Sequence, residues 1–168
     1  MTHFPAVQVL KFSGFSPIIT YASGHHADYL KSIGATHVVD RKTVSVADLP
    51  SEVKKITSAP VKTVFDAVSQ ADTQEAGYET LSEGGGISLV LPKSIKNVVE
   101  GKKIYEFFGS VTPPFNREFG VKVYSQLTQL LSDGTFVVGV KAFDALERFS
   151  HLFNSPTILR KFQVDWLE

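Results

Sequence analysis

The chain has 168 residues, with 17 basic and 17 acidic side chains and no cysteine. A chain of this length can form one domain with a sizeable core, and the lack of cysteine excludes a disulfide framework, thiol catalysis and cysteine-ligated zinc in this chain. The balanced charge includes no long run of one sign, which argues against a nucleic-acid surface and against a polybasic membrane patch.

The N-terminal segment indicates a short amphipathic helix over residues 6–12, with Val7 and Leu10, and as an alternative also Phe12, facing inward. Pro5 and Gln8 interrupt the apolar run that a signal peptide would need. No stretch of the chain approaches the roughly 20 apolar residues of a membrane span. We therefore expect a cytoplasmic protein whose partners are small molecules or other proteins.

From residue 18 onward, short apolar segments alternate with segments of helical periodicity. The apolar segments predict strands over residues 18–22, 37–40, 61–68, 87–91 and 103–108. The periodic segments predict helices over residues 27–33, 46–57, 71–82 and 118–132. Gly34 stands where the cap of the first of these helices is expected. Because the strands are apolar on both faces, the alternation predicts a doubly wound α/β fold, a parallel sheet with helices on both faces.

The C-terminal part follows this rhythm less closely. The helix at 118–132 carries an apolar side, which is more often core than a cofactor-binding surface; its members are Val121, Tyr124, Leu127, Leu130 and Leu131. After Gly134 the pattern indicates a strand at 136–140 and an amphipathic helix at 142–153.

Three passages in order resemble a known family. IITYASGHHADYLKSIGATHVVDR, then VKTVFDAVS and then LSEGGGISLVLP together resemble the cofactor-binding half of the medium-chain dehydrogenase/reductases, in particular their zinc-independent quinone-reductase and fungal trans-acting enoyl-reductase branch. The resemblance implies an NADPH-dependent oxidoreductase, in which the cofactor delivers hydride to an activated C=C bond. It also implies that residues 1–134 form a truncated Rossmann-like NAD(P)-binding domain, with 135–168 as a divergent C-terminal segment packed on it.

Two parts of the family pattern are not found in this sequence. The family binds the cofactor pyrophosphate at a glycine-rich turn between its first strand and first helix, but MTHFP stands at that place here. The catalytic domain that normally precedes the turn is not in the sequence either. We therefore expect an incomplete sheet, weakened NADP binding and no assignable catalytic residue. Two hypotheses remain: an oxidoreductase reduced to its cofactor-binding domain, or a non-catalytic remnant or interaction module.

The turn from Ser23 to His26 follows the first predicted strand, at the carboxyl end where ligands bind in open α/β sheets. The Ser23 hydroxyl suits a phosphate, as do the basic side chains of His26 and Arg41. No acidic residue ends this strand, whereas proteins that choose NAD commonly place Asp or Glu there. The resemblance thus implies that the turn holds the adenosine 2′-phosphate of NADP. The alternative is a solvated turn with two surface histidines.

Three further positions are candidates for the same edge of the sheet. The resemblance implies that Val68 and Ser69 lie near the adenine ribose and Leu91 near the nicotinamide. The alternative for all three is packing at strand ends. Asp66, inside the third strand, is expected to accept hydrogen bonds from backbone or from a helix N-terminus rather than to act in chemistry.

Other candidate sites receive little support. Residues 84–86 are three glycines that follow a helix and precede a strand, the reverse of the order in a phosphate loop, so they predict a turn. The five histidines show no metal-ligand spacing, and no nucleophile elbow accompanies a Ser-His-Asp set. We expect no metal and no triad. The strand at Lys103–Phe108 is the candidate edge for a homodimer.

Overall fold

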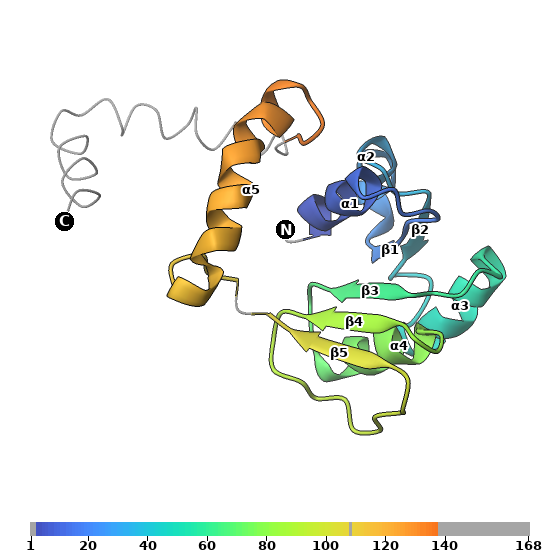
Figure 1. Cartoon of the computed structure of the whole chain (residues 1–168). Coiled ribbons are helices and arrows are strands. Elements are labelled where there is room, and N and C mark those ends of the chain that lie inside the picture. Colours follow the sequence, from blue (N-terminus) through green and yellow to red (C-terminus); the bar gives the residue numbers. More distant parts are fainter. Residues whose placement is uncertain (1–2, 108, 138–168) are drawn as a thin grey trace, which may run out of the picture. The chain divides into compact units, whose positions relative to one another are not determined.

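The computed structural model describes residues 3–107 and 109–137 (Figure 1). The chain divides into two compact units, of which the first ends at Gln129 and the second begins at Leu130. The sheets, the two apolar clusters and the candidate site all lie in the first unit.

Helices and strands alternate along the chain as the sequence predicts. The helices are α1 (His3–Phe12), α2 (Ala27–Ser32), α3 (Leu49–Ile56), α4 (Ala71–Thr80) and α5 (Pro114–Ser132), with short 3-10 turns η1 (Gly24–His26) and η2 (Val46–Asp48). The strands are β1 (Ile19–Ala22), β2 (His37–Asp40), β3 (Thr63–Asp66), β4 (Gly86–Leu89) and β5 (Lys103–Glu106). Gly34, with φ of +129°, follows the end of α2 as predicted, because glycine adopts this conformation without steric cost.

The strands form parallel ladders, which confirms the Rossmann-like α/β fold class. β1 pairs with β2 from Ile19 opposite His37 to Ala22 opposite Asp40. β3, β4 and β5 form a second sheet in that order, drawn side by side in Figure 1. The expected single sheet is therefore divided: among the described strands, β1 and β3 have no ladder between them.

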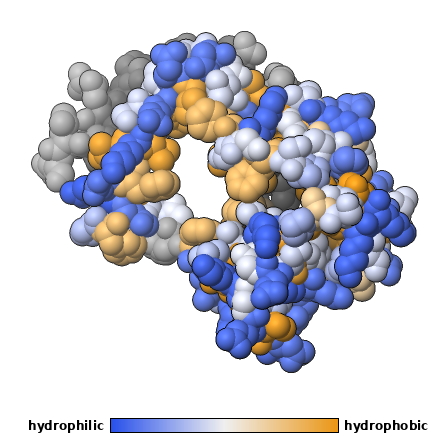
Figure 2. Space-filling view, turned by 45° about the vertical axis from the view of Figure 1, so that its right-hand side comes forward, coloured by the Kyte–Doolittle hydropathy of each residue, from blue (hydrophilic) through white to orange (hydrophobic). Residues whose placement is uncertain are grey.

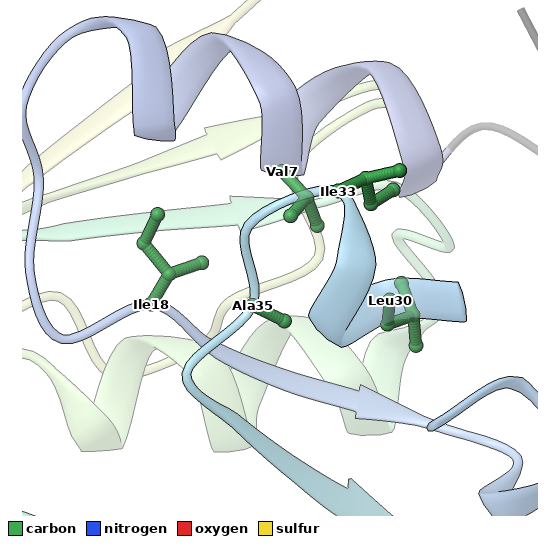
Figure 3. Close-up of a cluster of buried hydrophobic side chains, with 5 residues drawn as sticks. All are labelled: Val7, Ile18, Leu30, Ile33 and Ala35. Atoms are coloured by element: carbon green, nitrogen blue, oxygen red, sulfur yellow. The ribbon is translucent and has the colours of Figure 1, made fainter. Parts of the chain in front are cut away.

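Two clusters of apolar side chains form the core of this unit. The first joins α1, α2 and the segments next to β1 and β2 (Figure 3), and its members are Val7, Ile18, Leu30, Ile33 and Ala35. The second joins α4, β4 and the loop after β4, and its members are Tyr78, Leu81, Ile87, Leu89 and Ile95. Complete burial of one large apolar side chain contributes about 1.5–3 kcal/mol to the stability of the fold. Each cluster therefore stabilises the packing around its own sheet.

The expectation of a buried apolar side on α5 is wrong for Val121, Tyr124 and Leu131, which are exposed, whereas Leu127 and Leu130 are half-buried. Val121 and Tyr124 are 65% and 61% exposed, and the buried residue of this helix is Gly120. A side chain at position 120 would collide with Val111. The helix therefore packs closely against Val111 at Gly120, where there is no side chain in the way. Figure 2 shows hydrophobic residues interspersed with hydrophilic ones on the visible face.

None of the helices in the described part of the chain combines the length and the apolar character needed to cross a membrane. The helix predicted at 142–153 and residues 138–140 of the strand predicted at 136–140 lie outside the described residues. The packing of residues 135–168 on the first unit therefore stays a prediction.

Candidate functional site

The turn after β1 carries the first predicted site residue. Ser23 continues the strand in extended conformation, with φ of −68° and ψ of 134°, and η1 follows at once. The backbone N–H of His26 donates to the carbonyl oxygen of Ser23 at 3.0 Å, which closes the turn into α2. The Ser23 side chain is buried, so its hydroxyl has a defined place at the carboxyl end of the strand.

Arg41 reaches the same place from the neighbouring strand. It follows β2 directly, and its backbone N–H donates to the carbonyl oxygen of Ala22 at 3.0 Å. Its guanidinium Nε donates to the Ser23 hydroxyl at 3.0 Å. The parallel register therefore brings together two of the predicted phosphate-binding groups, which are 18 residues apart in the sequence.

His26 lies in the same turn, and its ring packs on that of His25. The two ring centroids are 3.8 Å apart, with a tilt of 46° between the planes. The turn thus carries two imidazoles in the three residues that follow Ser23.

Asp40 adds a carboxylate that the sequence reasoning missed. It ends β2, and its side chain lies against Gly24, where an added side chain would collide with it. Hydrogen bonds from the backbone N–H groups of Lys42 and Gly24 lower the pKa of Asp40, so the carboxylate is ionised at neutral pH. The signal that could have found it is the pairing of the two strands, because residues at the ends of paired parallel strands share one edge.

Ser69 lies just beyond β3, in the second sheet, and its hydroxyl both donates and accepts a hydrogen bond within the protein. It is buried and has a positive φ of 52°. Its hydroxyl donates to the carbonyl oxygen of Asp66 at 2.8 Å and accepts from the N–H of Val90 at 2.9 Å. These bonds join the end of β3 to the end of β4. This arrangement corresponds to the alternative given for Ser69 from the sequence, packing at the strand ends.

Asp66 has the structural role that was predicted for it. Its carboxylate accepts from the N–H groups of Val68 and Ser69 at 3.0 and 2.8 Å, and from the Thr73 hydroxyl at 2.8 Å. Because Thr73 lies in the first turn of α4, the carboxylate joins the strand to the helix that follows it.

Val68 and Leu91 occupy equivalent places on the paired strands. Each lies two residues beyond a residue of one register pair, Asp66 opposite Leu89. Both are exposed, at 43% and 45%. Together they give the carboxyl edge of this sheet an apolar surface that a flat ring could contact.

The three glycines ahead of β4 form a turn, as predicted. Gly84 has φ of +73°, and the N–H of Gly85 donates to the carbonyl oxygen of Ser82 at 3.0 Å. They close the connection from α4 to β4.

Residues 5–100 match the family model described as zinc-binding dehydrogenase. The chain belongs to this family. A curated relative, trans-enoyl reductase FSL5 of Gibberella zeae, is 30% identical over an alignment of 146 positions, which covers 77% of this chain and 40% of the relative. This member of the zinc-binding dehydrogenase family therefore spans less than half the length of that relative.

Solved structures agree with the fold. The nucleotide-binding subdomain of the enoylreductase domain of PpsC from Mycobacterium tuberculosis matches with a TM-score of 0.61 and 18% identity, over 81% of this chain and 79% of that one. A structure from Sinorhizobium meliloti, described as a zinc-binding dehydrogenase bound to NADP, matches with a TM-score of 0.61 and 19% identity, over 80% of this chain and 40% of that one. This family member therefore has the same fold as these two structures.

The residues present do not fit the zinc that the family's name implies. In the described ranges, no group of three or more His, Cys, Asp or Glu side chains is placed to hold a metal ion. We therefore derive no metal chemistry for this family member.

Proposed function

We propose that the chain binds the adenosine end of a nicotinamide cofactor at the turn after β1, with a preference for NADPH over NADH. The contact between Arg41 and Ser23 carries the proposal. A guanidinium and a hydroxyl are donors that suit a phosphate, and the two are already joined before any ligand arrives. A ligand that binds to preordered side chains loses less conformational entropy.

His26 supports the same assignment, because a protonated imidazole would add positive charge beside the phosphate. Asp40 acts against it, since a carboxylate repels a phosphate and accepts from a ribose hydroxyl. The hydrogen bonds from Gly24 and Lys42 direct this carboxylate to the backbone, and for that reason we favour the 2′-phosphate.

The remaining site residues receive different roles. We assign Val68 to the adenine-ribose side and Leu91 to the nicotinamide side of the cofactor, where their exposed apolar side chains offer contact area. We assign Ser69 to the scaffold under the adenine-ribose side, because its hydroxyl bonds to the two strands. No residue is assigned to catalysis.

For a complete protein we propose reduction of an activated C=C bond, as the name of the trans-enoyl reductase relative suggests. The bound cofactor would supply the hydride. The residues of this chain would bind and orient it, and the other face of the substrate cleft would come from a further domain.

Dimerisation through β5 is a separate proposal. Tyr105 and Phe107, in and just after this edge strand, are 46% and 57% exposed. An edge strand with exposed apolar residues can pair with a second copy. Sedimentation of the chain at increasing concentration tests this, and a monomer throughout would contradict it.

Titration of the chain with NADPH and with NADH, followed by calorimetry, tests the nucleotide site. We expect weak binding of NADPH, with a dissociation constant on the order of 1 mM, and a preference over NADH of about tenfold, or 1.4 kcal/mol. Ser23→Ala should reduce the preference, and Ser32→Ala, in α2 and away from the turn, is the matched control. Equal binding of the two nucleotides, or binding of neither, would overturn the proposal.

A further inference from the structure

Gln74 is a polar side chain in the interior of the first unit. It lies in α4 and is 0% exposed. Burial of an amide costs free energy unless its donors and its acceptor find partners. Its Nε2 donates to the carbonyl oxygens of Ser69 at 2.9 Å and Pro92 at 3.1 Å, and its Oε1 accepts from the N–H of Ser94 at 2.8 Å. This one side chain therefore joins α4 to the segment after β3 and to the segment after β4.

The three partners also determine which way the amide of Gln74 faces. Two of them are carbonyl oxygens, which can only accept, and the third is a backbone N–H, which can only donate. The amide nitrogen must therefore face the two carbonyl groups. An ionised glutamate would offer these carbonyl groups no donor, and an apolar side chain would offer nothing to any of the three. An amide of this length meets all three requirements.

Side chains hold the segment between β4 and β5. Four backbone N–H groups of this segment donate to side chains, and they belong to Lys93, Ser94, Lys96 and Val99. The accepting side chains, in the same order, are those of Glu106, Gln74, Glu75 and Tyr78, at 2.8, 2.8, 2.9 and 3.0 Å. All but the first of these acceptors lie in α4. The helix therefore determines where this segment runs.

Gln74 is the member of this set that also bonds to the end of the neighbouring strand. The place of Ser69 there is fixed by Asp66, whose carboxylate accepts from the N–H of Ser69 at 2.8 Å. The carbonyl oxygen of Ser69 is thus a fixed point at the end of β3. Through its two donor bonds, Gln74 connects this point to Pro92.

Leu91 lies between two residues that are both connected to Ser69. Val90, before it, donates its N–H to the Ser69 hydroxyl at 2.9 Å. Pro92, after it, is connected to the Ser69 carbonyl through Gln74. Leu91 itself is 45% exposed, so packing of its own side chain contributes little to its placement. Its position relative to the end of β3 depends on the bonds on either side of it.

We propose that Gln74 is a positioning residue for the nicotinamide cofactor, because it holds Leu91 in place relative to Val68. The inference rests on the proposed function, in which Val68 contacts the adenine-ribose side and Leu91 the nicotinamide side. Val68 is held without Gln74, since its N–H donates to the Asp66 carboxylate at 3.0 Å. Loss of the Gln74 amide should therefore release the nicotinamide side, while the adenosine side stays in place.

The test compares NADP⁺ with adenosine 2′,5′-bisphosphate, which carries the 2′-phosphate and has no nicotinamide. NMR titration measures the dissociation constants of both ligands for the chain and for Gln74→Met, whose side chain has a similar length and no amide. The matched control is Tyr78→Phe, which loses the hydrogen bonds between the Tyr78 hydroxyl and Val99. This control alters the same helix and the same segment but removes no bond to Ser69 or Pro92.

We expect the unchanged chain to bind NADP⁺ more tightly than the bisphosphate, because only NADP⁺ reaches Leu91. Gln74→Met should weaken NADP⁺ binding on the order of fivefold and bisphosphate binding less than about twofold, so that the ratio of the two constants approaches one. Tyr78→Phe should lower the urea midpoint of unfolding, as Gln74→Met does, and leave the ratio unchanged. The ratio therefore separates positioning of the cofactor from a loss of stability.

If Gln74→Met does not fold, the unchanged chain decides through the NMR signals of the Gln74 side-chain amide. These signals should shift with NADP⁺ and stay in place with the bisphosphate, because only a ligand that contacts Leu91 acts on the neighbouring Pro92.

The outcomes distinguish a failure of this inference from a failure of the proposed function. An unchanged ratio in Gln74→Met, an equal fall of the ratio in Tyr78→Phe, or amide signals that respond alike to both ligands would overturn the role of Gln74 alone. Equal binding of the two ligands by the unchanged chain, or binding of neither, contradicts the proposed function, and the inference fails with it. The second kind of failure is seen before any substitution is made.

Discussion

The Nε atom of Arg41 donates a hydrogen bond to the hydroxyl oxygen of Ser23 at 3.0 Å, across the ends of two paired parallel strands. This pair sets the first prediction. Arg41→Ala should weaken NADPH binding about tenfold or more, because a phosphate would lose a charged donor, and should change NADH binding much less. Lys42→Ala removes a neighbouring positive charge and is the matched control. Calorimetric titration measures both, and equal losses from the two variants would contradict a specific role for Arg41.

Replacement of Asp40 should change the affinity for NADPH in the opposite direction. Asp40→Asn removes a negative charge beside the proposed phosphate while it keeps an oxygen that can accept from the backbone. We expect NADPH to bind a few-fold more tightly and NADH to bind equally or more weakly. The same titrations measure this. Tighter binding of NADH would show that the carboxylate opposes the cofactor as a whole.

The lowered pKa of Asp40 also predicts how stability depends on pH. Hydrogen bonds from the N–H groups of Lys42 and Gly24 hold this pKa below its usual value of 3.8. Because the folded-state pKa is lower than the unfolded one, ionised Asp40 stabilises the folded chain above pH 3.8, and this stability is lost as the pH falls through the folded value.

Urea unfolding of the chain and of Asp40→Asn measures the effect. The difference between their unfolding free energies should be constant from neutral pH to about pH 5 and should shrink at lower pH. If the difference in unfolding free energy disappeared already above pH 5, the pH dependence would belong to another titrating group.

Gly24 and Asp40 should be coupled. A methyl group at position 24 would collide with the Asp40 carboxylate, so Gly24→Ala should lower the urea midpoint. In the double variant with Asp40→Ala the obstacle is gone, and the loss should be smaller than the sum of the single losses. Additive losses would show that the methyl group is accommodated in another way.

The junction between β3 and β4 predicts a pair of stability effects at Ser69. Both Ser69→Ala and Ser69→Gly lose the two hydroxyl bonds, at a cost of about 1–3 kcal/mol. Glycine adopts the φ of +52° without strain, so the Ala variant should be the less stable of the two by about 0.5–1 kcal/mol. Urea unfolding measures both, and the reverse order would contradict the strain argument.

Much of the fold could be predicted from local pattern. Short β-branched runs and helical spacing indicated each described helix and strand, and Gly34 marked a helix end, because these features depend on neighbouring residues only. The burial of α5 could not be predicted in this way. Its apolar residues stand on one side, but the close contact to Val111 is made at Gly120.

The candidate site divides along the same line. The sequence by itself determined that Ser23 and Arg41 follow strands, and that Asp66 would be held by hydrogen bonds. Only the tertiary structure decided that Arg41 reaches Ser23, that Asp40 lies against Gly24, that the Ser69 hydroxyl is used between strands, and that Gln74 joins Ser69 to Pro92. The reason is physical: periodicity specifies which segments form strands, whereas register and neighbour choice arise from long-range pairing of backbone groups, which local sequence does not encode.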